Sequence, residues 1–143
     1  MPIEYALEHM RFLAQCLKKD KPQSAVVAIL LELNISTNTM GFEYLKRAVM
    51  LCYEDPMQLI TKEIYQKVAD SCREPTSIAQ VEQTIRRAIN QAWKKENKDA
   101  FFRYFSREGS GILKKPTNAE FISRIVRIVE LWEGCFEQEA DHE

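Results

Sequence analysis

The fold is decided by residues 61–95, TKEIYQKVADSCREPTSIAQVEQTIRRAINQAWKK. A short helical pattern opens this stretch, with Thr61 as its N-cap and apolar side chains at helical spacing: Ile64, Val68, Ala69 and Cys72. Residues 73–76 form a turn that includes a proline. Ser77, or the residue before it, caps a longer helix that we expect to reach about Lys95. The stretch therefore predicts two helices joined by a turn.

The longer helix has an apolar side and a polar side. Its apolar residues fall within roughly 100° of arc when successive residues are about 100° apart, and they define the buried side: Val81, Ile85, Ala88, Ile89 and Ala92. Four polar residues point directly away from that side: Gln83, Arg87, Asn90 and Lys94. Gln80 flanks this polar face on one side, and Glu82 and Arg86 flank it on the other.

Such a pair of helices is typical of a helix-turn-helix that reads DNA. In the major groove, arginine can bridge guanine O6 and N7, glutamine can pair with adenine, and glutamate can accept from cytosine N4. The candidate base-reading residues are Gln80, Glu82, Gln83, Arg86 and Arg87. Hydroxyls, basic side chains and helix N-termini hold phosphates, and the candidate phosphate contacts are Thr76, Ser77, Asn90, Lys94, Lys114 and Lys115. Helix pairs with short turns also occur in most helical bundles, so the pattern alone leaves a purely structural role open.

The rest of the chain also has helical patterns. Apolar side chains recur every three or four residues in five further segments: residues 3–17, about 22–33, 40–54, a short aromatic-rich stretch after Asn97, and about 118–132. The chain contains only four glycines and five prolines, which is poor in turn residues and disfavours many short strands. We therefore predict an all-α fold, a compact bundle of about six or seven helices that contains the helix-turn-helix.

The chain divides into three parts. Its 143 residues, 45% of them hydrophobic, suit one ordinary globular domain. We assign residues 1–20 to an N-terminal amphipathic helix and linker, and residues 21–133 to the helix-turn-helix domain. Residues 134–143 are predicted to be an acidic, disordered tail, because the final eleven residues contain five acids and neither lysine nor arginine.

Charge is distributed unevenly along the chain. The formal net charge is −1, but residues 79–115 contain nine basic and four acidic side chains. That segment therefore carries +5 and the remainder carries −6. A basic segment suits a surface that meets DNA phosphates, although many helical domains have such a segment only as a solvated face.

Enzymes and metal proteins have little support in the composition. The four cysteines are far apart, without a CxxC pair, and we predict that they are reduced core residues: Cys16, Cys52, Cys72 and Cys135. The two histidines, His9 and His142, lie near opposite ends of the chain, so neither a histidine metal site nor a catalytic dyad is easily assembled. We expect no cofactor.

No apolar run is long enough to cross a bilayer and no signal-peptide pattern opens the chain, so we expect a cytoplasmic protein with no membrane partner.

Four segments resemble a known family in order and spacing. They are GFEYLKRAVMLCYED (41–55), ITKEIYQKVAD (60–70), VEQTIRRAINQAW (81–93) and KPTNAEFI (115–122). Together they are similar to the C-terminal DNA-binding effector domain of the stage 0 sporulation protein A family, the response regulators that initiate sporulation in endospore-forming bacteria. The resemblance extends over about residues 25–132, roughly three quarters of the chain.

The resemblance implies a six-helix domain that binds promoter DNA and contacts RNA polymerase through its sigma subunit. The recognition helix corresponds to residues 77–95, and the polymerase-facing surface to residues 97–115, with Lys98, Arg103 and Arg107 as its candidate residues. The family usually has arginines at the positions of Gln80 and Gln83, while Glu82 and Arg86 match. We therefore expect altered DNA specificity and lower affinity.

A second departure concerns the N-terminal side. The family proteins carry a phosphorylatable receiver domain ahead of the effector domain, whereas only about 20 residues precede the matching region here. The chain is either an excised domain or a free-standing relative, and the apolar stripe in residues 3–17 favours the relative. That helix either dimerises the protein or caps the domain core.

Another class of function is also open. The two glutamines suggest an interaction module that binds polymerase or a full-length homologue without reading DNA. Salt-dependent binding to promoter DNA would distinguish the two functions.

Overall fold

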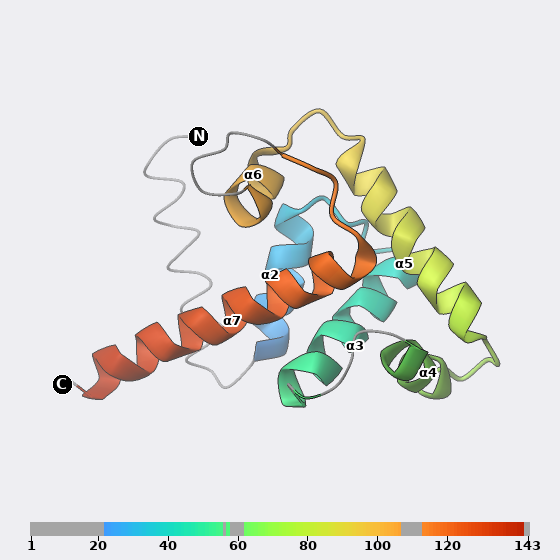
Figure 1. Cartoon of the computed structure of the whole chain (residues 1–143), viewed down its shortest axis with the longest axis horizontal. Helices are drawn as coiled ribbons and strands as arrows, with labels where there is room; N and C mark the ends of the chain where they lie inside the picture. The colour runs from blue at the N-terminus through green and yellow to red at the C-terminus, as the bar shows by residue number, and fades with distance from the viewer. Residues whose placement is uncertain (1–21, 56, 58–61, 107–112, 142–143) are drawn as a thin grey trace.

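Six helices make up the described part of the protein, a computed structural model that describes residues 22–55, 57, 62–106 and 113–141 (Figure 1). They are α2 (Pro22–Glu32), α3 (Met40–Glu54), α4 (Lys62–Asp70), α5 (Ile78–Trp93), α6 (Asp99–Phe105) and α7 (Asn118–Asp141). No strand occurs among the described residues, and the predicted all-α bundle is confirmed. The helix predicted in residues 3–17 and the N-cap Thr61 lie outside the described residues.

α3 is the central helix of the bundle. It packs against α2, α4, α5 and α7, and Figure 1 shows α7 crossing in front of α2. Thr39 caps the N-terminus of α3, because its Oγ1 accepts a hydrogen bond from the backbone N–H of Phe42 at 3.3 Å. The inward side chains of α3 follow the predicted helical spacing and are buried: Phe42, Leu45, Val49 and Cys52.

The turn at the end of α2 is hydrogen-bonded to the segment that follows α5. The backbone N–H groups of Asn34 and Ile35 donate to carbonyls of the preceding turn at 3.1 and 3.0 Å, which is the Schellman pattern. Asn34 has a φ of 67°, a left-handed conformation that asparagine tolerates better than most residues. Its Nδ2 donates to the Asn97 carbonyl at 3.1 Å, and Lys95 Nζ donates to the Asn34 carbonyl at 2.9 Å. The end of α2 therefore holds the segment that follows α5.

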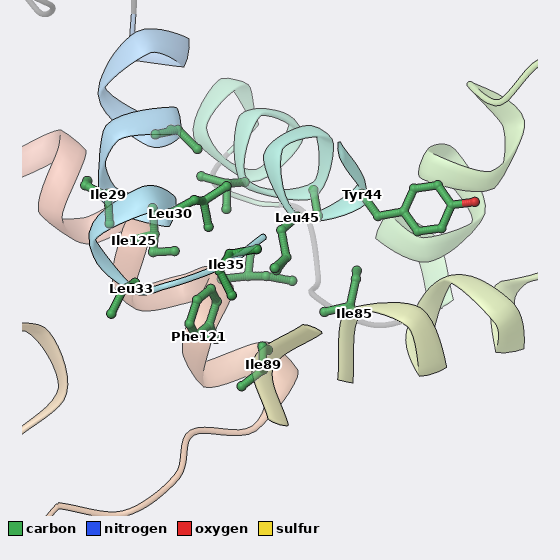
Figure 2. Close-up of a cluster of buried hydrophobic side chains, with 14 of the residues drawn as sticks. Ile29, Leu30, Leu33, Ile35, Tyr44, Leu45, Ile85, Ile89, Phe121 and Ile125 are labelled. Atoms are coloured by element: carbon green, nitrogen blue, oxygen red, sulfur yellow. The ribbon is translucent and has the colours of Figure 1, made fainter. Parts of the chain in front are cut away.

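One hydrophobic cluster receives side chains from all six helices. Figure 2 shows Ile85 and Ile89 of α5 pointing into this cluster, near Leu45 of α3 and Phe121 of α7. Both isoleucines are at most 1% exposed, and burying such a side chain contributes about 1.5–3 kcal/mol. Burial of this apolar side holds α5 on the core and leaves its polar side outward.

α3 and α5 approach each other closely at Gly41. A Cβ atom at this position would lie 2.6 Å from the Cβ of Ala88 and 3.3 Å from the Thr84 carbonyl oxygen. The first distance is well inside van der Waals contact. Glycine at position 41 therefore allows α5 to lie where it does.

α7 extends beyond the predicted domain boundary. We expected a disordered tail from residue 134, whereas α7 continues to Asp141, with the backbone alone described from residue 134 onward. Residues 135–141 include alanine, glutamine and two glutamates, which favour helix, and contain no proline. Their helix propensity continues the helix despite Gly134 and the acidic charge.

Two of the four cysteines are described with their side chains. Cys52 is buried and Cys72 is half-buried, and both are free thiols. Burial, with a smaller effect of the nearby carboxylate of Asp55, raises the pKa of Cys52 to about 11. The Cys52 thiol therefore stays protonated at neutral pH, as expected for a reduced core residue.

Candidate nucleic-acid interface

α4 and α5 form the predicted helix-turn-helix. Residues 71–77 connect them, the two helices pack against each other, and Figure 1 shows them together at one edge of the molecule. The buried residues of α4 are Ile64, Tyr65, Val68 and Ala69, and those of α5 are Val81, Ile85, Ile89 and Ala92. The predicted apolar face of α5 is therefore confirmed, with Ala88 half-buried at its edge.

Side chains from α3 hold the turn between α4 and α5. Arg47 donates from Nη1 to the Ser71 hydroxyl at 3.0 Å, and its Nε is 3.0 Å from Oε1 of Glu43. Tyr44 is buried, and Figure 2 shows its ring pointing from α3 toward the helix-turn-helix. Burial raises the pKa of Tyr44, whose hydroxyl lies beside Thr76. Sequence spacing does not reveal these anchors, because Arg47 and Ser71 are 24 residues apart in the chain and Tyr44 and Thr76 are 32 residues apart.

The start of α5 is capped as predicted. The Ser77 hydroxyl accepts a hydrogen bond from the backbone N–H of Gln80 at 3.1 Å. The Thr76 hydroxyl donates to Oε1 of Gln80 at 2.8 Å, which holds the glutamine side chain near the helix N-terminus. Ser77 is exposed and Thr76 is half-buried. Both predicted phosphate-contact hydroxyls therefore already have partners within the protein.

α5 and its C-cap residue carry seven of the eleven predicted DNA-binding side chains. Five of these seven are exposed: Gln80, Gln83, Arg86, Arg87 and Lys94. Gln83, Arg87 and Lys94 lie opposite the buried isoleucines by helical geometry. This face takes no part in the core, so its side chains are available to meet a ligand.

An ion pair lies on the flank of α5 that faces α7. Arg86 Nη2 lies 2.8 Å from Oε1 of Glu82, and these side chains are 59% and 41% exposed. A pair so exposed, four residues apart on a helix, contributes only about 0.3–0.5 kcal/mol. Asn118, the first residue of α7, donates from Nδ2 to the Glu82 carbonyl at 3.0 Å. The start of α7 is therefore attached to the middle of α5.

A surface cavity of about 500 Å³ lies along this flank, lined by residues from α4, α5 and the start of α7. It brings together four of the predicted site residues: Glu82, Arg86, Asn90 and Lys115. Its lining also includes Lys62, Tyr65 and Asn118, which the sequence did not identify as site residues. No spacing in the sequence connects residue 62 with residue 115, because tertiary packing alone brings them to one place.

The other predicted contacts lie outside this cavity. Lys114 is exposed just ahead of α7. Lys98 donates to the Lys95 carbonyl at 2.9 Å and lies 5.3 Å from the ring centroid of Trp93. Arg103 is ion-paired with Glu32 at 2.9 Å. Arg107, the third predicted polymerase-facing residue, lies outside the described residues.

The described part of the chain contains no group of three histidine, cysteine, aspartate or glutamate side chains placed to hold a metal ion. None of its helices is both long and apolar enough to cross a membrane.

Comparison with known protein families identifies the domain. Residues 26–129 match the family described as "Sporulation initiation factor Spo0A C terminal". This range begins in α2 and ends in α7, so it includes the helix-turn-helix and the helices that support it. The chain therefore belongs to this family of DNA-binding regulatory domains of sporulation.

Proposed function

We propose that the protein is a sequence-specific transcription regulator that places α5 in the major groove of double-stranded promoter DNA. The observation that carries this proposal is the division of α5 into two faces. One face is buried in the core through Ile85 and Ile89, and the other exposes glutamine, arginine and lysine side chains. A rigid helix with an exposed polar face is what major-groove recognition requires.

Each predicted base-reading residue has a chemical role in this proposal. Arg86 and Arg87 suit guanine, Gln80 and Gln83 suit adenine, and Glu82 suits cytosine. In the free protein Arg86 is paired with Glu82 and Gln80 accepts from Thr76. These contacts are exposed and individually weak, so exchanging them for contacts with base edges costs little.

Phosphate contacts surround this base-reading face. The proposed set is Thr76, Ser77, Asn90, Lys94, Lys114 and Lys115. Lys94 is exposed at the C-terminal end of α5, and the two other lysines are exposed ahead of α7. Contacts of this kind fix the position of the protein on DNA without reading the sequence.

Replacing Arg87 with alanine tests the base-reading role. We expect specific binding to weaken by about 1–3 kcal/mol, because a bidentate contact to guanine is lost, and the preference at that base pair to relax. The measurement is a binding titration with the preferred site, first defined by selection from random DNA, and with a site changed at that base pair.

Lys94→Ala is the matched control on the same exposed face. A phosphate contact is independent of sequence, so this variant should lose affinity for preferred and random DNA by the same factor. If Arg87→Ala also weakens both DNAs equally, Arg87 does not read a base. If the unaltered protein shows no salt-dependent DNA binding, the interaction-module alternative replaces this proposal.

Contact with RNA polymerase, through its sigma subunit, is the second part of the proposal. Supporting it, the side of α6 that faces away from the core presents Phe102, which is 47% exposed, next to Arg103. Exposed aromatic and arginine side chains are enriched among residues that dominate protein interfaces. Lys98 and Arg107 complete the proposed surface.

The proposed location of the protein is the cytoplasm, where bacterial promoters and polymerase are found.

A homodimer is the third part of the proposal, and deleting residues 1–19 tests it. The apolar residues of this segment repeat every 3.5 residues on average, which suits a nearly parallel partner helix: Ile3, Leu7, Met10, Ala14 and Leu17. We expect the shortened protein to fold, and to lose affinity for paired half-sites more than for a single site. Sedimentation of both proteins with one-site and two-site DNA measures this. An intact chain that stays monomeric on both DNAs, or a shortened chain that does not fold, contradicts the dimer.

A further inference from the structure

The cavity on the flank of α5 has an unusual charge arrangement. Its lining includes three cationic side chains from three separate segments: Lys62 of α4, Arg86 of α5 and Lys115 ahead of α7. Among the described residues the lining contains a single carboxylate, that of Glu82, which is already paired with Arg86 at 2.8 Å. Three cations against one anion leave this lining with a net charge of +2.

The two lysines are not neutralised within the described part of the chain. Neither Lys62 nor Lys115 forms an ion pair with a carboxylate among the described residues, and both side chains are exposed. Like charges gathered around one concavity repel each other, and an anion placed between them removes that repulsion. The electrostatics of the cavity therefore favour an anionic occupant.

The neutral part of the lining suits a phosphate ester. Thr117 lies just before α7, Asn118 and Ala119 begin the helix, and the first N–H groups of a helix attract anions. Apolar surface comes from Ile89, Pro116 and the ring of the buried Tyr65. A volume of about 500 Å³ is larger than one phosphate group needs, so the cavity also has room for the sugar or other organic part attached to it.

We propose that this cavity is a phosphate-binding site in which Lys62 and Lys115 are the ligands. The phosphate has two possible sources, a phosphodiester of the DNA backbone or a free phosphate ester. The first source rests on the proposed function, because a duplex seated on the outward face of α5 has its backbone at the flank of that helix. The second source does not depend on DNA binding.

Two lysine variants and a matched control test the site on the full-length protein. Lys62→Gln and Lys115→Gln, alone and combined, remove the charges while retaining polar side chains. Lys67→Gln is the control, because Lys67 lies on α4 outside the cavity and is 3.9 Å from Glu63. Circular dichroism of each variant verifies that the helices are retained.

The DNA measurement is a salt titration of binding to random-sequence duplex. Each lysine that holds a phosphate should contribute about 0.9 to the slope of log affinity against log salt concentration. Each lysine-to-glutamine substitution should therefore make the fall in DNA affinity between 50 and 200 mM salt about three- to fourfold smaller, and Lys67→Gln should not change it.

The second measurement titrates the DNA-free protein with inorganic phosphate at constant ionic strength. Amide resonances of residues 62–65, 115 and 117–119 should shift and saturate, and the double variant should abolish this response.

The outcomes separate this proposal from the proposed function. A lower salt slope in both lysine variants identifies the DNA backbone as the phosphate source. Saturable phosphate shifts without any change of slope identify a free phosphate ester as the source. The cavity proposal is wrong if the unaltered protein binds DNA, while the double variant behaves like Lys67→Gln and phosphate shifts no amide resonance. In that case the proposed function is unaffected. If the unaltered protein does not bind DNA, the proposed function fails and the phosphate titration alone decides the cavity.

Discussion

Replacing Phe101 with alanine should lower the free energy of unfolding by about 3–5 kcal/mol. Phe101 is completely buried and lies at the centre of an aromatic group. Its ring centroid is 5.2 Å from that of Trp93, 5.8 Å from that of Phe105 and 6.4 Å from that of Phe121. Truncation removes these contacts and leaves a cavity that the surrounding helices fill only in part. For a domain of this size the loss is a large fraction of a total stability of about 5–15 kcal/mol.

Phe102→Ala is the control for this prediction. Phe102 is the next residue of the same helix and is 47% exposed, so its truncation should cost less than about 1 kcal/mol. Urea denaturation followed by circular dichroism measures both variants. Because Trp93 ends α5 and touches Phe101, Phe101→Ala should also loosen the end of α5. Similar unfolding energies for the two variants would contradict the central position of Phe101 in the core.

Gly41→Ala should destabilise the protein although it adds only a methyl group. That methyl would lie 2.6 Å from the Cβ of Ala88 and 3.3 Å from the Thr84 carbonyl oxygen. Neither atom is the end of a flexible side chain, so α3 and α5 must separate. Overpacking of this kind costs about 1–3 kcal/mol, which exceeds the roughly 1 kcal/mol gained when alanine replaces a helical glycine. DNA affinity should fall as well, because α5 is displaced relative to the start of α7.

A second substitution removes the clash from the opposite side. Ala88→Gly deletes the methyl group that Gly41→Ala meets, at a cost of about 1 kcal/mol for a glycine inside a helix. The double variant should therefore be more stable than the sum of the two single effects predicts, with a coupling of about 1 kcal/mol or more. Chemical denaturation of the four proteins provides the full cycle. Additive effects would show that α3 and α5 do not touch at this point.

The elements that the sequence predicted best are those set by local chemistry. The two faces of α5 follow from the helical period, and Ser77 caps the helix because its hydroxyl reaches the Gln80 N–H. The end of α7 was placed too early, since acidic charge suggested disorder where helix propensity continues the helix to Asp141. Local patterns therefore identify helices and their buried sides more reliably than the point at which a charged helix ends.

The arrangement of the candidate site was only partly predictable. The helical period of the sequence predicts that Arg86 lies on a flank of α5. It does not predict the contact of Arg86 with Glu82, because side-chain pairing depends on rotamers. Lys62 was missed altogether, since it meets Lys115 only after α4, α5 and α7 have packed. Residues that act together across tertiary contacts leave no spacing in the sequence by which to recognise them.

The separation of α5 into a core face and an outward face has a consequence for how this family diversifies. Gln80, Gln83 and Arg87 are exposed and contribute nothing to the hydrophobic cluster. Under the proposed function, exchanging them changes the base preference while the free energy of folding stays within about 0.5 kcal/mol. After a gene duplication, two copies can therefore acquire different target promoters by single substitutions, without compensating changes in the core.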